Sequence, residues 1–148
     1  MFHSVLVVCV GNICRSPVGE RLLAAKVPGL AVGSAGIGAL AGQAADATMA
    51  AVAARHGLTL DGHVARQFTP HMGGSSDLIL VMEPGHRREI LCQAPQLAGR
   101  VMLFDRWTGG HGISDPYRHP SEIHEQIFIE LCAASDAWAK QLGSRGSR

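Results

Sequence analysis

The chain has 148 residues, of which 47% are hydrophobic and 17% charged, which suits one globular domain and excludes a disordered chain. Its net charge of +1 gives no reason to expect binding to nucleic acid or to a membrane surface. The four cysteines are too few and too unevenly spaced for a disulfide scaffold, and the longest apolar stretches are too short to span a membrane. We therefore expect a cytoplasmic protein.

Apolar segments alternate along the chain with segments that have helical periodicity. The predicted strands cover residues 5–8, 30–35, 77–82 and 101–104. Predicted helices begin at Ser16-Pro17, after a capping Asp46, at Pro84 and near Ser121. This order predicts an α/β fold, a three-layer sandwich in which a four-stranded parallel sheet has helices on both faces. We expect one domain over residues 1–148, with 143–148 as a frayed tail.

The strongest chemical signal is the segment that follows the first strand, CVGNICRSP at residues 9–17. Backbone amides at the start of a helix bind phosphate, and the guanidinium of Arg15 can contact two phosphate oxygens at once. The same positive surroundings favour the thiolate form of Cys9, which is the nucleophilic form. The pattern predicts a phosphate-binding loop between the first strand and the first helix, with covalent phosphoryl chemistry at Cys9.

Other residues of this loop have expected supporting roles. Gly11 would permit a backbone φ that a Cβ hinders, Asn12 would brace the loop, and the Ser16 hydroxyl would donate to the thiolate. A buried cysteine beside an incidental arginine is the plain alternative, and the added Gly-Asn and Ser-Pro pairs argue against it. The residues expected to bind substrate here are Val10, Gly11, Asn12, Ile13, Cys14 and Ser16.

The segment resembles the phosphate-binding loop of the low-molecular-weight protein tyrosine phosphatases. The resemblance extends along the chain to Asp115-Pro116-Tyr117 before the last helix. Residues 34–36, 62–67 and 77–82 resemble the bacterial branch that is associated with tyrosine autokinases of exopolysaccharide and capsule export. The resemblance implies hydrolysis of phosphotyrosine through a phosphocysteine intermediate, without cofactor or metal. A tyrosine-phosphorylated protein, in particular a membrane tyrosine autokinase, is the implied partner.

A phenolate leaving group, whose conjugate acid has a pKa of about 10, calls for a general acid. Asp115 follows a glycine-rich loop, and the resemblance implies that it is this acid and later the base that directs water at the phosphocysteine. Tyr117 is implied to line the cleft beside the substrate ring, and as the only tyrosine it is also the candidate for phosphorylation. Leu40 would form the opposite wall, at a position where some relatives carry an aromatic residue.

Three further expectations concern histidines and cysteines. The resemblance implies that His63 braces Asn12, and that Cys14 can form a reversible disulfide with Cys9. The remaining histidines show no metal-ligand spacing, so we expect them to be solvated or incidental and no metal to be bound. Cys92 and Cys132 lie in apolar, periodic segments and are expected to be buried thiols.

Three alternatives remain at this stage. An arsenate reductase of the same fold needs two further cysteines, and only Cys92 lies in the corresponding region. A protein arginine phosphatase of the same family would carry threonine at the position of Ile13. A non-catalytic phosphotyrosine-binding module would not need the reactive residue types Cys9, Arg15, Ser16 and Asp115 together.

Overall fold

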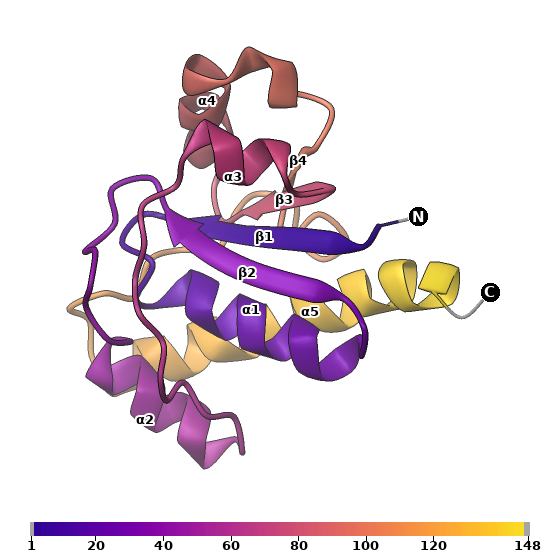
Figure 1. Cartoon of the computed structure of the whole chain (residues 1–148). Helices are drawn as coiled ribbons and strands as arrows, with labels where there is room; N and C mark the ends of the chain where they lie inside the picture. Colours follow the sequence, from indigo (N-terminus) through magenta and orange to yellow (C-terminus); the bar gives the residue numbers. More distant parts are fainter. Residues whose placement is uncertain (1, 147–148) are drawn as a thin grey trace.

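The computed structural model describes the chain from residue 2 to residue 146, with side chains to residue 143. Four parallel strands form one sheet in the order β2-β1-β3-β4. Helices α1, α2 and α5 cover one face of the sheet, and α3 and α4 cover the other (Figure 1). The predicted sandwich is therefore confirmed. The strands are β1 (Ser4–Cys9), β2 (Ala31–Gly36), β3 (Leu78–Val81) and β4 (Val101–Leu103).

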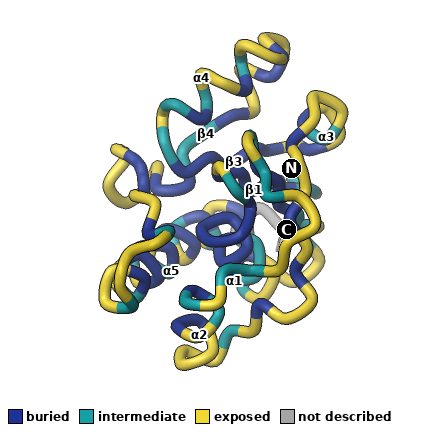
Figure 2. The backbone as a smooth tube through the Cα atoms, turned by 90° about the vertical axis from the view of Figure 1, so that its left-hand side faces the viewer, coloured by how far each residue is buried: buried dark blue, intermediate teal, exposed yellow. Residues whose placement is uncertain are grey.

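The alternation of side chains along each strand divides the apolar residues into two cores. Val5, Val7 and Leu80 point toward α1, α2 and α5 and belong to the larger core. Leu6 and Val8 point the other way and pack with residues of α4 and the segment after it. Figure 2 shows the result, with buried backbone in the centre and exposed backbone on the outer helix surfaces. Because β1 is buried on both faces, its carboxyl end is held firmly from two sides.

Most element boundaries match the sequence prediction. The helices are α1 (Arg15–Lys26), α2 (Ala47–Arg55), α3 (Pro70–Gly74), α4 (Pro84–Gln93) and α5 (Ser121–Gly146), with a 3₁₀ turn, η1 (Pro95–Leu97). Asp46 caps α2 by accepting a hydrogen bond from the Met49 amide, as expected. The sequence analysis did not anticipate α3 and η1, which are only five and three residues long.

Two predictions at helix ends were wrong. Ser16 does not cap α1: Cys14 is the N-cap residue and no side chain caps that end, because the Ser16 hydroxyl is directed to Cys9. Residues 143–146, expected to be frayed, form the last turn of α5, which the buried side chain of Leu142 anchors to the core. Residues 147–148 of the expected tail lie outside the described residues.

The strand order places a crossover point at the carboxyl end of β1. From β1 the chain passes through α1 to β2 on one side, whereas β3 lies on the other side. Ligands of open parallel sheets bind where neighbouring connections diverge in this way. The loop between Cys9 and Arg15 begins at that point. No helix among the described residues is long and apolar enough to cross a membrane.

Candidate active site

Most of the predicted site residues line one cavity of about 180 Å³ at the carboxyl end of β1. Its wall comes from the loop, from the segment after β2 and from the segment before α5. The predicted residues that line it are Cys9, Val10, Gly11, Ile13, Cys14, Arg15, Leu40, Asp115 and Tyr117. The other three, Asn12, Ser16 and His63, are buried around the loop.

Hydrogen bonds from outside the loop hold its carbonyl groups. The carbonyls of Cys9, Val10 and Gly11 accept bonds from the amides of Ile37, Gly38 and Leu40, each at 3.0 Å. The Ile13 carbonyl accepts from the Asp46 amide at 2.8 Å. Since these carbonyls are engaged outward, the amides of the tight loop remain available for an anion in the cavity.

The nucleophile is positioned by a chain of side-chain hydrogen bonds. Cys9 Sγ lies 2.9 Å from Ser16 Oγ, which accepts a bond from Asn12 Nδ2 at 2.8 Å. Asn12 Nδ2 also donates to Ser34 Oγ at 3.0 Å, and Ser34 Oγ donates to Glu20. Because Ser16 Oγ accepts from Asn12, its own proton is free for the Cys9 sulfur. A thiolate at Cys9 therefore has a fixed donor.

Asn12 is the residue with the special backbone conformation in this loop. Its φ is 59°, in the left-handed region, whereas Gly11 has no positive φ, so the reason predicted for Gly11 was wrong. A Cβ on Gly11 would find only ordinary contacts at 3.6 Å or more. Asparagine tolerates the left-handed region better than most residues. Its Oδ1 accepts from the Arg66 amide at 2.9 Å, and its carbonyl contacts His63 Nε2 at 2.6 Å.

Arg15 is 1% exposed and has one edge of its guanidinium free. Nη1 donates to Glu83 Oε2 at 2.6 Å and to the Ile113 carbonyl at 2.7 Å. Nε is buried without a hydrogen-bond partner, and Nη2 lies 3.8 Å from Asp115 Oδ2. The Nε and Nη2 edge is the one that grips two oxygens of a tetrahedral oxyanion side by side.

Asp115 and Tyr117 occupy the opposite rim. Asp115 Oδ1 accepts from the Tyr117 amide at 3.0 Å, and its side chain is 45% exposed. Because the turn engages Oδ1, Oδ2 is the oxygen that lies on the side of Arg15 in the cavity. A carboxyl group at this position is suited to donate a proton to a leaving group bound in the cavity. Leu40 lies in the cavity wall together with Gly38.

Two residues that bind side chains of the loop, Ser34 and Glu83, were not among the predicted site residues. Ser34 lies in β2, and Glu83 follows β3 by two residues. Both stand near the carboxyl end of a strand beside β1, and that position was the available signal. His86 Nε2 lies 3.5 Å from Glu83 Oε2, and burial is the main cause that lowers the pKa of His86, with the Arg15 charge adding to it.

Several expectations for cysteines and histidines were wrong. Cys92 is exposed and Cys132 is only half-buried. His86 and His124, expected to be solvated or incidental, are buried. Cys9 and Cys14 are both buried free thiols, and their predicted disulfide stays a prediction.

Comparison with known proteins decides the family. The sequence model described as "Low molecular weight phosphotyrosine protein phosphatase" matches residues 4–148. This chain belongs to that family. It is similar to the low molecular weight protein-tyrosine-phosphatase Etp of Escherichia coli strain K12, with 48% identity over 141 residues and 95% of each chain covered.

Solved structures of the low molecular weight phosphatases agree with the fold. The tyrosine phosphatase Wzb from Escherichia coli K30, in complex with sulphate, has a TM-score of 0.94 at 44% identity, covering 96% of this chain and 99% of that one. The YwlE arginine phosphatase from Geobacillus stearothermophilus has a TM-score of 0.91 at 29% identity, covering 97% and 94%. The fold is thus shared with an arginine phosphatase, whereas the closer sequence similarity is to tyrosine phosphatases. The chain is a protein tyrosine phosphatase.

Proposed function

We propose that phosphotyrosine is hydrolysed in two steps by Cys9, Arg15 and Asp115. The Cys9 thiolate attacks phosphorus and the bond to the tyrosine oxygen breaks, while Asp115 transfers its proton to the departing phenolate. Asp115, now ionised, takes a proton from water, whose oxygen attacks the phosphocysteine. The products are inorganic phosphate and the Cys9 thiolate, and Asp115 is again protonated.

The observation that carries this proposal is the free Nε and Nη2 edge of Arg15 in the cavity that also contains Cys9 and Asp115. That edge and the amides of the loop would stabilise the three equatorial oxygens as the phosphoryl group moves from oxygen to sulfur. The Ser16 hydroxyl would stabilise the thiolate when it is released in the second step. Tyr117 and Leu40 would enclose the phenol ring.

Leaving-group dependence tests the role of Asp115. Asp115→Asn should lower kcat/KM, which reports the first step alone, by about 10²–10⁴ for phosphotyrosine and much less for an aryl phosphate whose phenol is strongly acidic, because such a phenolate leaves without protonation. Cys9→Ser should abolish turnover of both substrates. An equal loss in Asp115→Asn for both substrates would contradict the role of general acid.

We also propose that the physiological substrate is a bacterial tyrosine autokinase of exopolysaccharide or capsule export. The support is the similarity to Etp and Wzb together with the apolar wall of the cavity, which suits an aromatic ring. Asp115→Ala should trap the tyrosine-phosphorylated protein in a pull-down from the source cell. Recovery of no tyrosine-phosphorylated protein would count against this partner, and faster turnover of phosphoarginine than of phosphotyrosine would favour the arginine alternative.

A further inference from the structure

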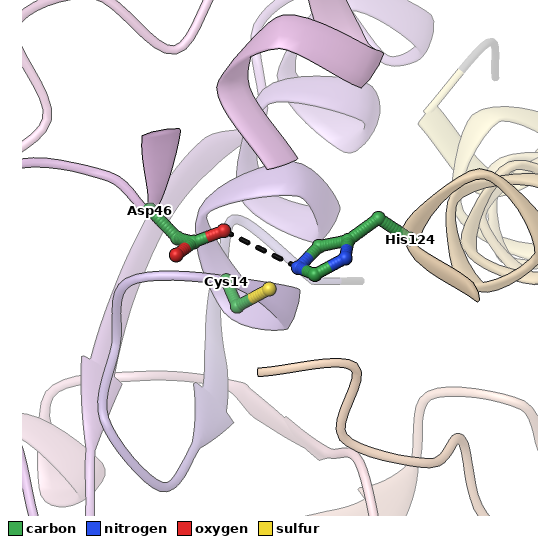
Figure 3. A group of neighbouring side chains, drawn as sticks. All are labelled: Cys14, Asp46 and His124. Carbon is green, nitrogen blue, oxygen red and sulfur yellow. Dashed lines mark ion pairs between the residues drawn. The ribbon is translucent and has the colours of Figure 1, made fainter. Parts of the chain in front are cut away.

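A second cluster of reactive side chains lies directly behind the phosphate-binding loop. Figure 3 shows three side chains that point toward one another: the Cys14 thiol, the Asp46 carboxylate and the His124 imidazole. These atoms lie within 4.8 Å of one another. Cys14 is the residue at the N-cap position of α1, Asp46 caps α2 and His124 lies in the first turn of α5, so three elements supply the three groups. The mechanism uses neither Asp46 nor His124.

The bonding of His124 leaves one ring nitrogen without a hydrogen bond. Nδ1 lies 3.2 Å from the Pro120 carbonyl, which can only accept, so a bond there requires the proton on Nδ1. In the neutral ring, Nε2 then presents a lone pair. It is buried without a hydrogen-bond partner and lies 3.3 Å from Asp46 Oδ2. A lone pair facing a carboxylate is unfavourable unless a positive charge is placed between them.

Cys14 supplies the third group. Its thiol is 4% exposed, and its sulfur lies within 4.8 Å of the Asp46 carboxylate and the His124 ring. A thiolate is the metal-binding form of cysteine, and a bound cation would compensate its charge in this buried setting. Cys14 also lines the active-site cavity.

We propose that Cys14, Asp46 and His124 form a binding site for a thiophilic divalent cation, with Zn²⁺ as the ion of matching chemistry. One thiolate, one imidazole and one carboxylate are all common zinc ligands, and a water entering from the cavity would complete a tetrahedron. The Nδ1 bond to the Pro120 carbonyl resembles the outer hydrogen bond that orients metal-binding histidines. Binding releases the thiol proton to solvent as the sulfur–metal bond forms. The bound ion would join the phosphate-binding loop to α2 and α5.

Cobalt titration of the full chain tests the site, because Co²⁺ replaces Zn²⁺ and a thiolate bound to it gives a charge-transfer absorption band. The parent protein carries Cys9→Ser and Cys92→Ser, which remove the nucleophile and the exposed thiol as competing ligands. We expect a saturable band at one Co²⁺ per chain, its displacement by Zn²⁺, and protection of Cys14 from alkylation by Zn²⁺.

Two substitutions remove a metal ligand while preserving the local structure. His124→Asn keeps a donor near the position of Nδ1 for Pro120, and Asp46→Asn can still cap α2. Because losing even an outer partner lowers metal affinity by about 10- to 100-fold, we expect a loss of at least ~100-fold in both His124→Asn and Asp46→Asn. A third substitution, Cys14→Ser, removes the thiolate and should give no band. His56→Asn is the matched control, since it changes an exposed histidine beside Glu125, and should bind as the parent does.

The metal-free melting temperature of each variant shows whether it is folded. Absence of the band in the parent would overturn the proposal. A band that persists unchanged in Cys14→Ser or in His124→Asn would overturn it as well. If one variant fails to fold, the remaining substitution and the alkylation of Cys14 still decide the question.

Discussion

Asn12 combines an unusual backbone conformation with four hydrogen-bonding contacts. Its amide and carbonyl groups connect the loop to Ser16, Ser34, Arg66 and His63. Its backbone lies in the left-handed region, which asparagine and aspartate adopt more readily than other residues that carry a Cβ. Both properties contribute to the stability of the loop, and substitutions can separate them.

Asn12→Ala should lower the free energy of unfolding by about 2–3 kcal/mol, because buried partners lose their bonds and alanine is strained at this φ. Asn12→Gly loses the same side-chain bonds without the strain, so it should be more stable than Asn12→Ala by about 1 kcal/mol. Urea denaturation of the two variants and the wild type measures both differences. Equal stability of Asn12→Ala and Asn12→Gly would show that the backbone conformation costs nothing here.

Glu83 is expected to affect catalysis through Arg15. Its carboxylate fixes Nη1, and so orients the free edge of the guanidinium. Glu83→Gln keeps the shape but loses the charge, so we expect kcat/KM for an aryl phosphate to fall by roughly 10- to 100-fold, the range that a small misplacement of a catalytic group produces. Because half-exposed Glu83 contributes little to the core, the melting temperature should change little. Normal kcat/KM in this variant would mean that the Ile113 carbonyl alone positions Arg15.

At the scale of elements, the end of β2 fits closely against the phosphate-binding loop. A Cβ on Gly36 would lie 2.2 Å from the Val10 carbonyl oxygen and 3.0 Å from the Asn12 amide. The first distance is a backbone clash that no side-chain movement relieves. Glycine at this position therefore allows β2 to approach the loop and to hold its carbonyls.

Gly36→Ala should therefore displace the loop, with a loss of stability of about 1–3 kcal/mol, as for overpacking, and a larger proportional loss of kcat/KM. Gly38→Ala is the matched control, because its Cβ would meet only Val10 Cγ1 at an ordinary 3.7 Å. Denaturation and steady-state kinetics on both variants provide the comparison. Similar effects of the two substitutions would rule out the clash as the cause.

The sequence predicted the strands and the long helices because hydrophobic periodicity is a local property. It failed for α3, which is too short for a periodic pattern, and for the last turn of α5, where small and polar residues continue a helix that Leu142 anchors. The loop from Cys9 to Arg15 was predictable because its residues are contiguous.

Asp46 and His124 were not predictable as part of this region, because only tertiary structure brings them to the loop. For Ser34 and Glu83, the only available signal was a position near the carboxyl end of a strand. The expectation of no metal relied on spacing within the sequence. Spacing cannot reveal a group such as Cys14, Asp46 and His124, whose members belong to three separate elements.

At the scale of the whole molecule, buried titratable groups couple folding to pH. His86 packs beside Glu83 and the Arg15 guanidinium, and its pKa is lowered from 6.5 by burial first and by Arg15 second. Asp77 is exposed and Glu125 is half-buried, and hydrogen bonds from the His3 amide and from His56 respectively are the main causes that lower their pKa values. The histidine and the two carboxylates therefore act in different pH ranges.

Stability should decline in two stages as the pH falls from 8. Below about pH 6.5 the unfolded chain protonates His86 more readily than the folded chain does, so protons favour unfolding. Near pH 4 and below, Asp77 and Glu125 lose their native hydrogen bonds on protonation, and stability falls again. Urea midpoints measured from pH 8 to pH 3 follow both stages.

His86→Gln should remove the first stage and leave the second, because glutamine does not titrate. His71→Gln is the control, since it changes an exposed histidine of α3 that is remote from Glu83. We therefore expect the curve of His71→Gln to match that of the wild type, and the curve of His86→Gln to be flatter between pH 6.5 and pH 5. A wild-type slope in His86→Gln over that interval would contradict the assignment of the first stage to His86.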